Sequence, residues 1–199
     1  MTQPRTTPVF AMLLALTAVI LVVLPFVSTF DDALTQVGMR LGIAAPLQVI
    51  VPAEVRVTVV VLGLFGIHAG AAGNQLVVWN ASGARQTIFI SWNCVGWQSL
   101  ILLGLSLMVG LRGQMSLATR IEVIAFGVAG TILVNVARIT VVCLLAALAG
   151  YVPAVMFHDY GGTLLLVAWL FSFWMIAYRW LVPDGAAIMA TIPLSSLPA

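Results

Sequence analysis

The sequence predicts an all-α membrane protein, a multi-span helical bundle of about four to six spans that carries a small extracytoplasmic β-hairpin. Of its 199 residues, 62% are apolar and only 7% are charged, whereas about a quarter of the residues in a soluble domain are charged. The mean hydropathy is +1.16. Since one span takes about 20 residues, we expect a single membrane domain over residues 1–199.

The charges and the potential metal ligands are few and scattered. Eight basic and six acidic residues give a net charge of +2, without the basic patch that nucleic-acid binding requires. Two histidines and two cysteines make a poor ligand set for zinc, which takes three or four such side chains. We therefore expect no nucleic-acid partner, no metal and no cofactor.

The first span is expected from Val9 to Val27, an apolar run longer than the core of about 7–15 residues found in a signal peptide. Arg5 precedes this run, and the acids Asp31 and Asp32 follow it. The positive-inside rule then places the N-terminal tail in the cytoplasm and the two acids outside.

The next segment is broken by helix-disrupting residues. From Ala33 to Ala53 the apolar pattern contains Pro46 and Pro52, which leaves open a re-entrant or an interfacial segment. Val55 to Gly66 predicts a helix of about 12 residues. Its rise of about 18 Å is too short for a hydrocarbon layer of about 30 Å.

A β-hairpin is predicted by two runs rich in β-branched and aromatic residues. Gln75 to Trp79 and Gln86 to Trp92 are separated by Asn80 to Ala84, a segment of turn-forming residues. An open hairpin in lipid would leave backbone groups unpaired, so we expect this hairpin at the aqueous surface.

Three further spans are predicted at about Val95–Leu111, Ile121–Gly150 and Gly161–Val182. Arg112 and Arg120 flank the short loop between the first two of these spans, which places that loop in the cytoplasm. The segments before Val95 and after Gly150 then lie on the outer face. There we expect Pro153 to end the helix and a loop to carry His158. The tail from Pro183 to Ala199 is expected to be loosely ordered.

Cys94 stands where a polar segment becomes a long apolar run. Asn93, Gly96 and Gln98 surround it, and a helix N-terminus stabilises a thiolate through its dipole. Asn93 and Gln98 are therefore candidates for supporting the thiol. The alternative is an inert cysteine packed in a span, an interpretation that fits Cys143 well.

Arg138 lies within an apolar run, where an arginine costs about 2.5 kcal/mol or more at the centre of a bilayer and is by default a functional candidate. It lies about 26 Å along the helix from Ile121, close to the expected depth of Cys94. The alternative is an arginine that extends to the outer headgroups. Asn135, three residues earlier, projects on the same side and is a candidate for holding the guanidinium.

His158 is the candidate general base, because an imidazole can take the proton of a thiol and return it to a leaving amine. The alternative is a solvated histidine in a loop. Asp159 is either an orienting partner of the imidazole or a surface acid. His68 competes for the role of base, but it has no polar neighbour in the sequence.

Taken together, these motifs resemble the exosortase and archaeosortase family over about Ala53 to Leu181. The motifs that carry the resemblance are, in order, Leu-Gly-Leu-Phe-Gly-Ile from Leu62, Gly-Asn-Gln-Leu-Val-Val from Gly73, Asn-Cys-x-Gly-x-x-Ser from Asn93, Asn-x-x-Arg from Asn135, and His158. The resemblance implies a multi-pass cysteine transpeptidase of the cell membrane with its active site on the extracytoplasmic side. Its partners would be membrane lipid and precursor proteins that end in a short motif, a transmembrane helix and a basic cluster.

Residue by residue, the resemblance implies that Cys94 is the nucleophile, Arg138 the clamp for substrate and oxyanion, and His158 the general base and acid. The enzyme would cleave near the motif and transfer the new carboxyl terminus to an acceptor through a thioester. Val95 departs from the serine that many members have after the cysteine. Two other functions remain open: a non-catalytic scaffold that binds a partner transmembrane helix, and a thiol redox protein that uses Cys94 and Cys143.

Overall fold

The computed structural model describes residues 10, 14, 17, 18, 25, 29–79, 83–112 and 115–181. The expected first span, apart from isolated residues, and the expected loose tail lie outside these residues. Within them, four helical stretches are long and apolar enough to cross a membrane: Ala44–Leu64, Trp92–Gly110, Leu117–Leu148 and Tyr151–Leu181. The prediction of a multi-span helical membrane fold with a small sheet is confirmed.

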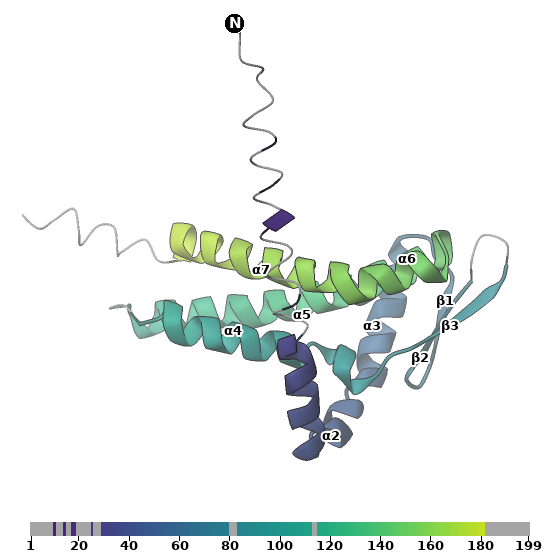
Figure 1. Cartoon of the computed structure of the whole chain (residues 1–199), viewed down its shortest axis with the longest axis horizontal. Helices are drawn as coiled ribbons and strands as arrows, with labels where there is room; N and C mark the ends of the chain where they lie inside the picture. Colours follow the sequence, from purple (N-terminus) through teal and green to yellow (C-terminus); the bar gives the residue numbers. More distant parts are fainter. Residues whose placement is uncertain are drawn as a thin grey trace, which may run out of the picture.

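Among the described residues, the helices α4 (Trp97–Gly110), α5 (Leu117–Leu148) and α7 (Gly162–Ile176) form the bundle (Figure 1). The central helix α5 packs against α4 and against α7. It begins at an N-cap, Ser116, whose hydroxyl accepts a hydrogen bond of 3.1 Å from the backbone N–H of Thr119, and such a cap favours the start of a helix. The bundle therefore has one helix with a neighbour on either side.

The prediction that His158 lies in an outer loop is wrong. After α5 the chain forms α6 (Tyr151–Met156), then a π-helical turn η2 (Phe157–Gly161), and continues directly into α7 and a second π-turn, η3 (Ala177–Leu181). Pro153 lies in the first turn of α6, where backbone N–H groups need no partner within the helix, so the proline is tolerated. His158 is consequently held on a helix.

The segment before the sheet also differs from the prediction. Residues 29–40 are helical, followed by the short helix α2 (Ala44–Gln48) and by α3 (Val51–Leu64). The predicted start at Val55 was wrong, because Pro52 sits at the beginning of α3, a position that favours proline. Helix α3 crosses the direction of the bundle at one end of α5 (Figure 1). The stretch Ala44–Leu64 has 21 residues and reaches the length of a span.

The sheet has three antiparallel strands, β1 (Ala69–Ala72), β2 (Gln75–Trp79) and β3 (Arg85–Phe89), in the order β1-β2-β3. The predicted hairpin is confirmed as β2 and β3, and β1 is an additional strand. Its small residues have little strand propensity, but a two-residue turn with Gly73 at φ +60° pairs Ala72 with Gln75.

The buried side chains form two clusters at opposite ends of the bundle. One joins α3, β2 and the C-terminal half of α5: Val51, Val55, Leu62, Leu76, Val78, Ile90, Ile139, Cys143 and Ala147. The other joins α4, α7 and the N-terminal half of α5: Leu103, Leu107, Val123, Phe173 and Ala177. The sheet is thus fixed at one end of the bundle, beside α6 and α3 (Figure 1).

Candidate active site

Cys94 lies in a short 3-10 turn, η1 (Trp92–Val95), which joins β3 to α4. Its Sγ is 3.7 Å from the hydroxyl of Ser91, and its backbone N–H donates a 2.9 Å hydrogen bond to the Ser91 carbonyl. Gly96, at φ +79°, reverses the chain between the turn and the helix. Cys94 is therefore half-buried in the turn that directly precedes α4, at the mouth of this helix as expected.

Asn135 on α5 anchors the turn that carries Cys94, called here the cysteine turn (η1). Its side-chain nitrogen donates to the carbonyl oxygen of Cys94 at 2.8 Å and to Oε1 of Glu54 at 2.6 Å. A Cβ atom on Gly96 would lie only 2.8 Å from Cγ of Asn135, so the close approach requires glycine. The predicted contact between Asn135 and the guanidinium is replaced by these two bonds.

Asn93 and Gln98 bind each other and the helix of residues 29–40. Gln98 donates to Oδ1 of Asn93 at 2.8 Å, and Asn93 donates to the hydroxyl of Thr35 at 3.0 Å. On the other side of the turn, Oε1 of Gln48 accepts the backbone N–H of Trp92 at 2.9 Å. Asn93 and Gln98 thus stabilise the turn, as predicted for supporting residues, but their side-chain amides make no hydrogen bond to the sulfur.

His158 reaches the thiol from the π-turn η2. Its imidazole lies beside the Cys94 thiol and interacts with it electrostatically, and its Nδ1 lies 3.0 Å from Oδ1 of Asp159. When Nδ1–H donates to the aspartate, Nε2 is the nitrogen left for the thiol. Asp159 thus contacts the imidazole, although its side chain is 54% exposed.

Arg138 extends from α5 toward the start of α7. Its Nη2 donates to the backbone carbonyl of His158 at 3.3 Å. The guanidinium passes so close to Gly162 that a Cβ atom there would lie 2.9 Å from Cζ. Arg138 is half-buried between the two helices. This position differs from that of an arginine that extends along the lipid face to the headgroups.

Cys94, Arg138 and His158 line one pocket. The other lining residues are apolar or small: Ile88, Phe89, Ile90, Ile139, Val142 and Cys143. The structure therefore brings the thiol, the guanidinium and the imidazole together from three elements, η1, α5 and η2. A low-polarity wall around such groups strengthens electrostatic interactions among them.

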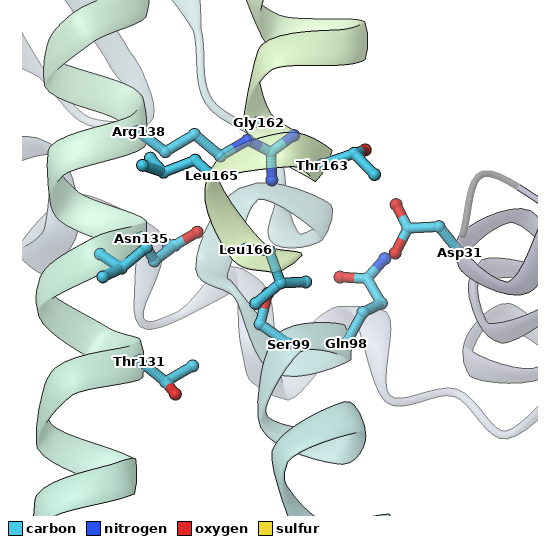
Figure 2. A pocket seen from close by; sticks show the side chains of 11 residues that line it. Asp31, Gln98, Ser99, Thr131, Asn135, Arg138, Gly162, Thr163, Leu165 and Leu166 are labelled. Carbon is cyan, nitrogen blue, oxygen red and sulfur yellow. The ribbon is translucent and has the colours of Figure 1, made fainter. Parts of the chain in front are cut away.

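A second, more polar pocket lies on the other side of Arg138 (Figure 2). Gln98 and Asp31 face it from one side, and Thr131 and Asn135 face it from α5. Burial raises the pKa of the Asp31 carboxyl above its ordinary value, and Arg138 nearby opposes that rise. The guanidinium is thus shared by the two pockets.

Residues that sequence reasoning missed come mainly from the segment before the sheet. Asp31, Thr35, Gln48 and Glu54 all contact the cysteine turn, its bracing amides or the second pocket. Glu54 carried a signal, because a lone acid in an apolar helix is as costly as the arginine that we singled out. Thr35 and Gln48 carried none, since neutral polar residues are common in membrane helices.

Among the described residues, the two remaining candidates, Cys143 and His68, form no hydrogen bond with a polar side chain that would activate them. Cys143 is fully buried in the cluster under the sheet, and both cysteines are free. His68 precedes β1 at the opposite edge of the sheet from β3, and its carbonyl accepts the backbone N–H of Trp79. Within the part of the chain that the structure describes, no three His, Cys, Asp or Glu side chains gather in a group that could hold a metal.

Comparison with curated proteins and with solved structures returns no match for either set. A family model described as transmembrane exosortase does match, over residues 5–175. The match covers all the elements that carry the pocket, from the helix of residues 29–40 to most of α7. It confirms the resemblance stated from the motifs, and the chain belongs to the transmembrane exosortase family.

Proposed function

We propose that this protein is a membrane cysteine transpeptidase that cleaves C-terminal sorting signals of exported proteins. Its substrates would carry a short motif, a transmembrane helix and a basic cluster at their C-terminus. The observation that supports this function is the pocket that Cys94, Arg138 and His158 line together, with the imidazole beside the thiol. Membership of the exosortase family supports a role in protein sorting.

In the first half-reaction, His158 takes the proton of the Cys94 thiol as the sulfur attacks the carbonyl carbon of the scissile peptide bond. The carbonyl oxygen becomes an oxyanion, which the Arg138 guanidinium stabilises by donating hydrogen bonds. When the tetrahedral intermediate collapses, the C–N bond breaks and His158 returns its proton to the leaving amine. The products are a thioester on Cys94 and the released helical tail.

In the second half-reaction, an amine, a hydroxyl or a water molecule attacks the thioester. His158 accepts the proton of this acceptor, the C–S bond breaks, and the proton passes to the sulfur. Asp159 holds the imidazole in one tautomer through Nδ1. Asn135 fixes the position of the cysteine turn by donating a hydrogen bond to the Cys94 carbonyl.

The distribution of arginines supports an active site on the extracytoplasmic side. Arg112 and Arg120 flank the loop between α4 and α5, at the end of the bundle opposite the sheet. The cysteine turn and the sheet then lie at the outer surface, where exported precursors would present their motif. The substrate helix would lie in the membrane beside the bundle.

The test compares the two cysteines in cells. An exported reporter with an epitope tag and a C-terminal motif, apolar helix and basic cluster is co-expressed with the wild-type enzyme, Cys94→Ala or Cys143→Ala. We expect Cys94→Ala to abolish removal of the tail and Cys143→Ala to leave it close to wild type. Intact-mass measurement of trapped enzyme should show the thioester adduct on a peptide containing Cys94. Unchanged processing in Cys94→Ala would rule out the proposed function.

Two further variants and a crosslinking measurement separate the enzyme from a scaffold. A scaffold that binds a partner helix predicts that Cys94→Ser is silent while Arg138→Ala loses a crosslinked complex. A redox protein predicts that Cys143→Ala is as damaging as Cys94→Ala.

A further inference from the structure

A groove opens along one edge of the sheet. Strand β3 forms one wall, and α5 and α6 form the other, with Thr87, Phe89, Ala146 and Ala154 among the lining residues. The groove has a volume of about 540 Å³, within the range of about 300–1,000 Å³ typical of ligand sites. The pocket at Cys94 is far smaller, with a volume of only about 40 Å³. Most of a bound substrate must therefore lie outside that pocket.

The groove runs into the pocket at the thiol. Ile88, Phe89, Val142 and His158 line both cavities. Strand β3 itself leads into the turn that carries Cys94, so the edge of the sheet and the sulfur belong to one continuous segment. A chain that follows the groove arrives at the proposed nucleophile.

The free edge of β3 presents backbone hydrogen-bonding groups to this groove. In an antiparallel pair, alternate residues direct their N–H and C=O groups to the partner strand. The backbone N–H of Ile90 donates to Asn74 at 2.9 Å, so by the alternation Ile88 also points its groups toward β2. Thr87 and Phe89 then point theirs away from β2. Among the described strands, β3 has no partner on that side.

The side chains that line the groove supply little charge. Apart from His158, they are apolar or neutral, and two of them are alanines. Binding energy along this wall must therefore come mainly from backbone hydrogen bonds and apolar contact. An extended peptide that adds to an open strand edge uses these same interactions.

We propose that the precursor binds as an added strand: the segment that contains its sorting motif pairs with the free edge of β3 and delivers the scissile carbonyl to Cys94. The inference rests on the proposed function, because it assigns the substrate's conformation at the same site. Recognition then depends on the backbone groups of Thr87 and Phe89 as well as on side chains. The sheet becomes four-stranded in the enzyme–substrate complex.

Removal of one edge donor tests the proposal. Thr87→Pro deletes an N–H that points away from β2, so the pairing of β3 with β2 is retained. The matched control is Ala71→Pro, which deletes an outward N–H at the opposite edge, since β1 and β2 are joined through His68 and Trp79. For both variants, the rate of tail removal is measured with the tagged reporter. The rate at which a small iodoacetamide probe alkylates Cys94 shows whether the turn that carries this cysteine is intact.

We expect Thr87→Pro to slow removal of the reporter tail by about tenfold and Ala71→Pro by less than about twofold, with equal alkylation rates in both. Equal processing by the two variants would overturn the added-strand proposal and leave the proposed function standing. If instead the wild-type enzyme and Cys94→Ala process the reporter equally, the proposed function itself fails.

A crosslinking measurement covers the case in which the proline variant does not accumulate. In a background of Cys94→Ala and Cys143→Ala, Thr87→Cys should form a disulfide with a cysteine placed in the reporter motif, and Ala71→Cys should not. Crosslinking at both positions, or at neither, would overturn the proposal.

Discussion

The two halves of helix α5 are held by different kinds of contact. In its N-terminal half, Phe126 stacks at 5.9 Å on Phe173, and its ring lies 5.8 Å from that of Trp169. In its C-terminal half, Asn135 and Arg138 make polar contacts to η1, α3 and η2. The comparison shows that apolar packing holds the N-terminal half of this helix, called here the apolar end. The C-terminal half, called here the polar end, adds to its own buried apolar cluster the polar contacts that position the site.

Glycines make the apolar end possible. A Cβ atom on Gly127 would lie 3.0 Å from the Phe173 ring, and one on Gly130 would overlap the Trp169 ring. The indole N–H of Trp169 donates to the Thr131 hydroxyl at 2.9 Å, which fixes the ring against α5. Small residues at helix contacts in membranes allow such close packing.

At the polar end, the two cysteines differ although both line the same pocket. Cys94 has the Ser91 hydroxyl and the His158 imidazole as neighbours, whereas Cys143 is fully buried among apolar side chains. A thiol becomes a nucleophile when a base or a donor stabilises its thiolate. The environment, and not the presence of a cysteine, therefore distinguishes the proposed nucleophile.

The largest effect is expected where the polar end meets the substrate. Arg138→Gln removes the charge proposed to stabilise the oxyanion, and reporter processing should fall by about 10²–10³-fold, as for the loss of one oxyanion donor. The measurement is the rate of tail removal at matched enzyme levels. Processing within about twofold of wild type would show that the guanidinium has no part in the reaction.

The next effect should appear at the apolar end as a loss of stability. In Gly130→Leu the new side chain would overlap the Trp169 ring, so the two helices must move apart. We expect the protein to be destabilised by about 1–3 kcal/mol. The measurement is thermal unfolding in detergent. The matched control is Gly104→Leu on α4, where a Cβ atom meets nothing within 4 Å. Equal unfolding temperatures for the two variants would contradict the packing role of Gly130.

Replacement of Glu54 by leucine should destabilise the protein by about 1–2 kcal/mol and lower the processing rate. Glu54→Leu leaves one side-chain N–H of Asn135 without its partner, and a buried unpaired donor is costly. Glu54→Gln keeps an acceptor and should stay close to wild type. Unfolding and reporter processing are both measured. If the leucine and glutamine variants behave alike, the hydrogen bond to Asn135 does not position the cysteine turn.

The smallest effect is expected at Asp159. Its contact with His158 is exposed, with 46% and 54% of the two side chains accessible, and exposed pairs contribute little. Asp159→Asn should therefore slow processing by about two- to fivefold without a change in stability. A loss as large as that of Arg138→Gln would show that the orientation of the imidazole depends on this carboxylate.

Features that depend on neighbouring residues could be predicted from the sequence. Hydropathy over windows of about 20 residues indicated the spans at α4, α5 and α7, and alternating β-branched residues indicated β2 and β3. Polar residues in apolar runs pointed to Cys94 and Arg138. Errors arose where the same residue is compatible with two structures. Proline occurs both after the end of a helix and in the first turn of one, and Pro153 lies in the first turn of α6.

Apolar composition and the placement of polar residues by themselves determined that this chain is a helical membrane protein with a thiol at the mouth of a span. Only the tertiary structure decided which groups surround that thiol. Asn135 and Glu54 are 81 residues apart, and Thr35 and Asn93 are 58 apart, yet each pair is hydrogen-bonded. No local sequence pattern encodes such pairings. A polar group buried without a partner is unfavourable, and here each group finds its partner only when distant helices pack together.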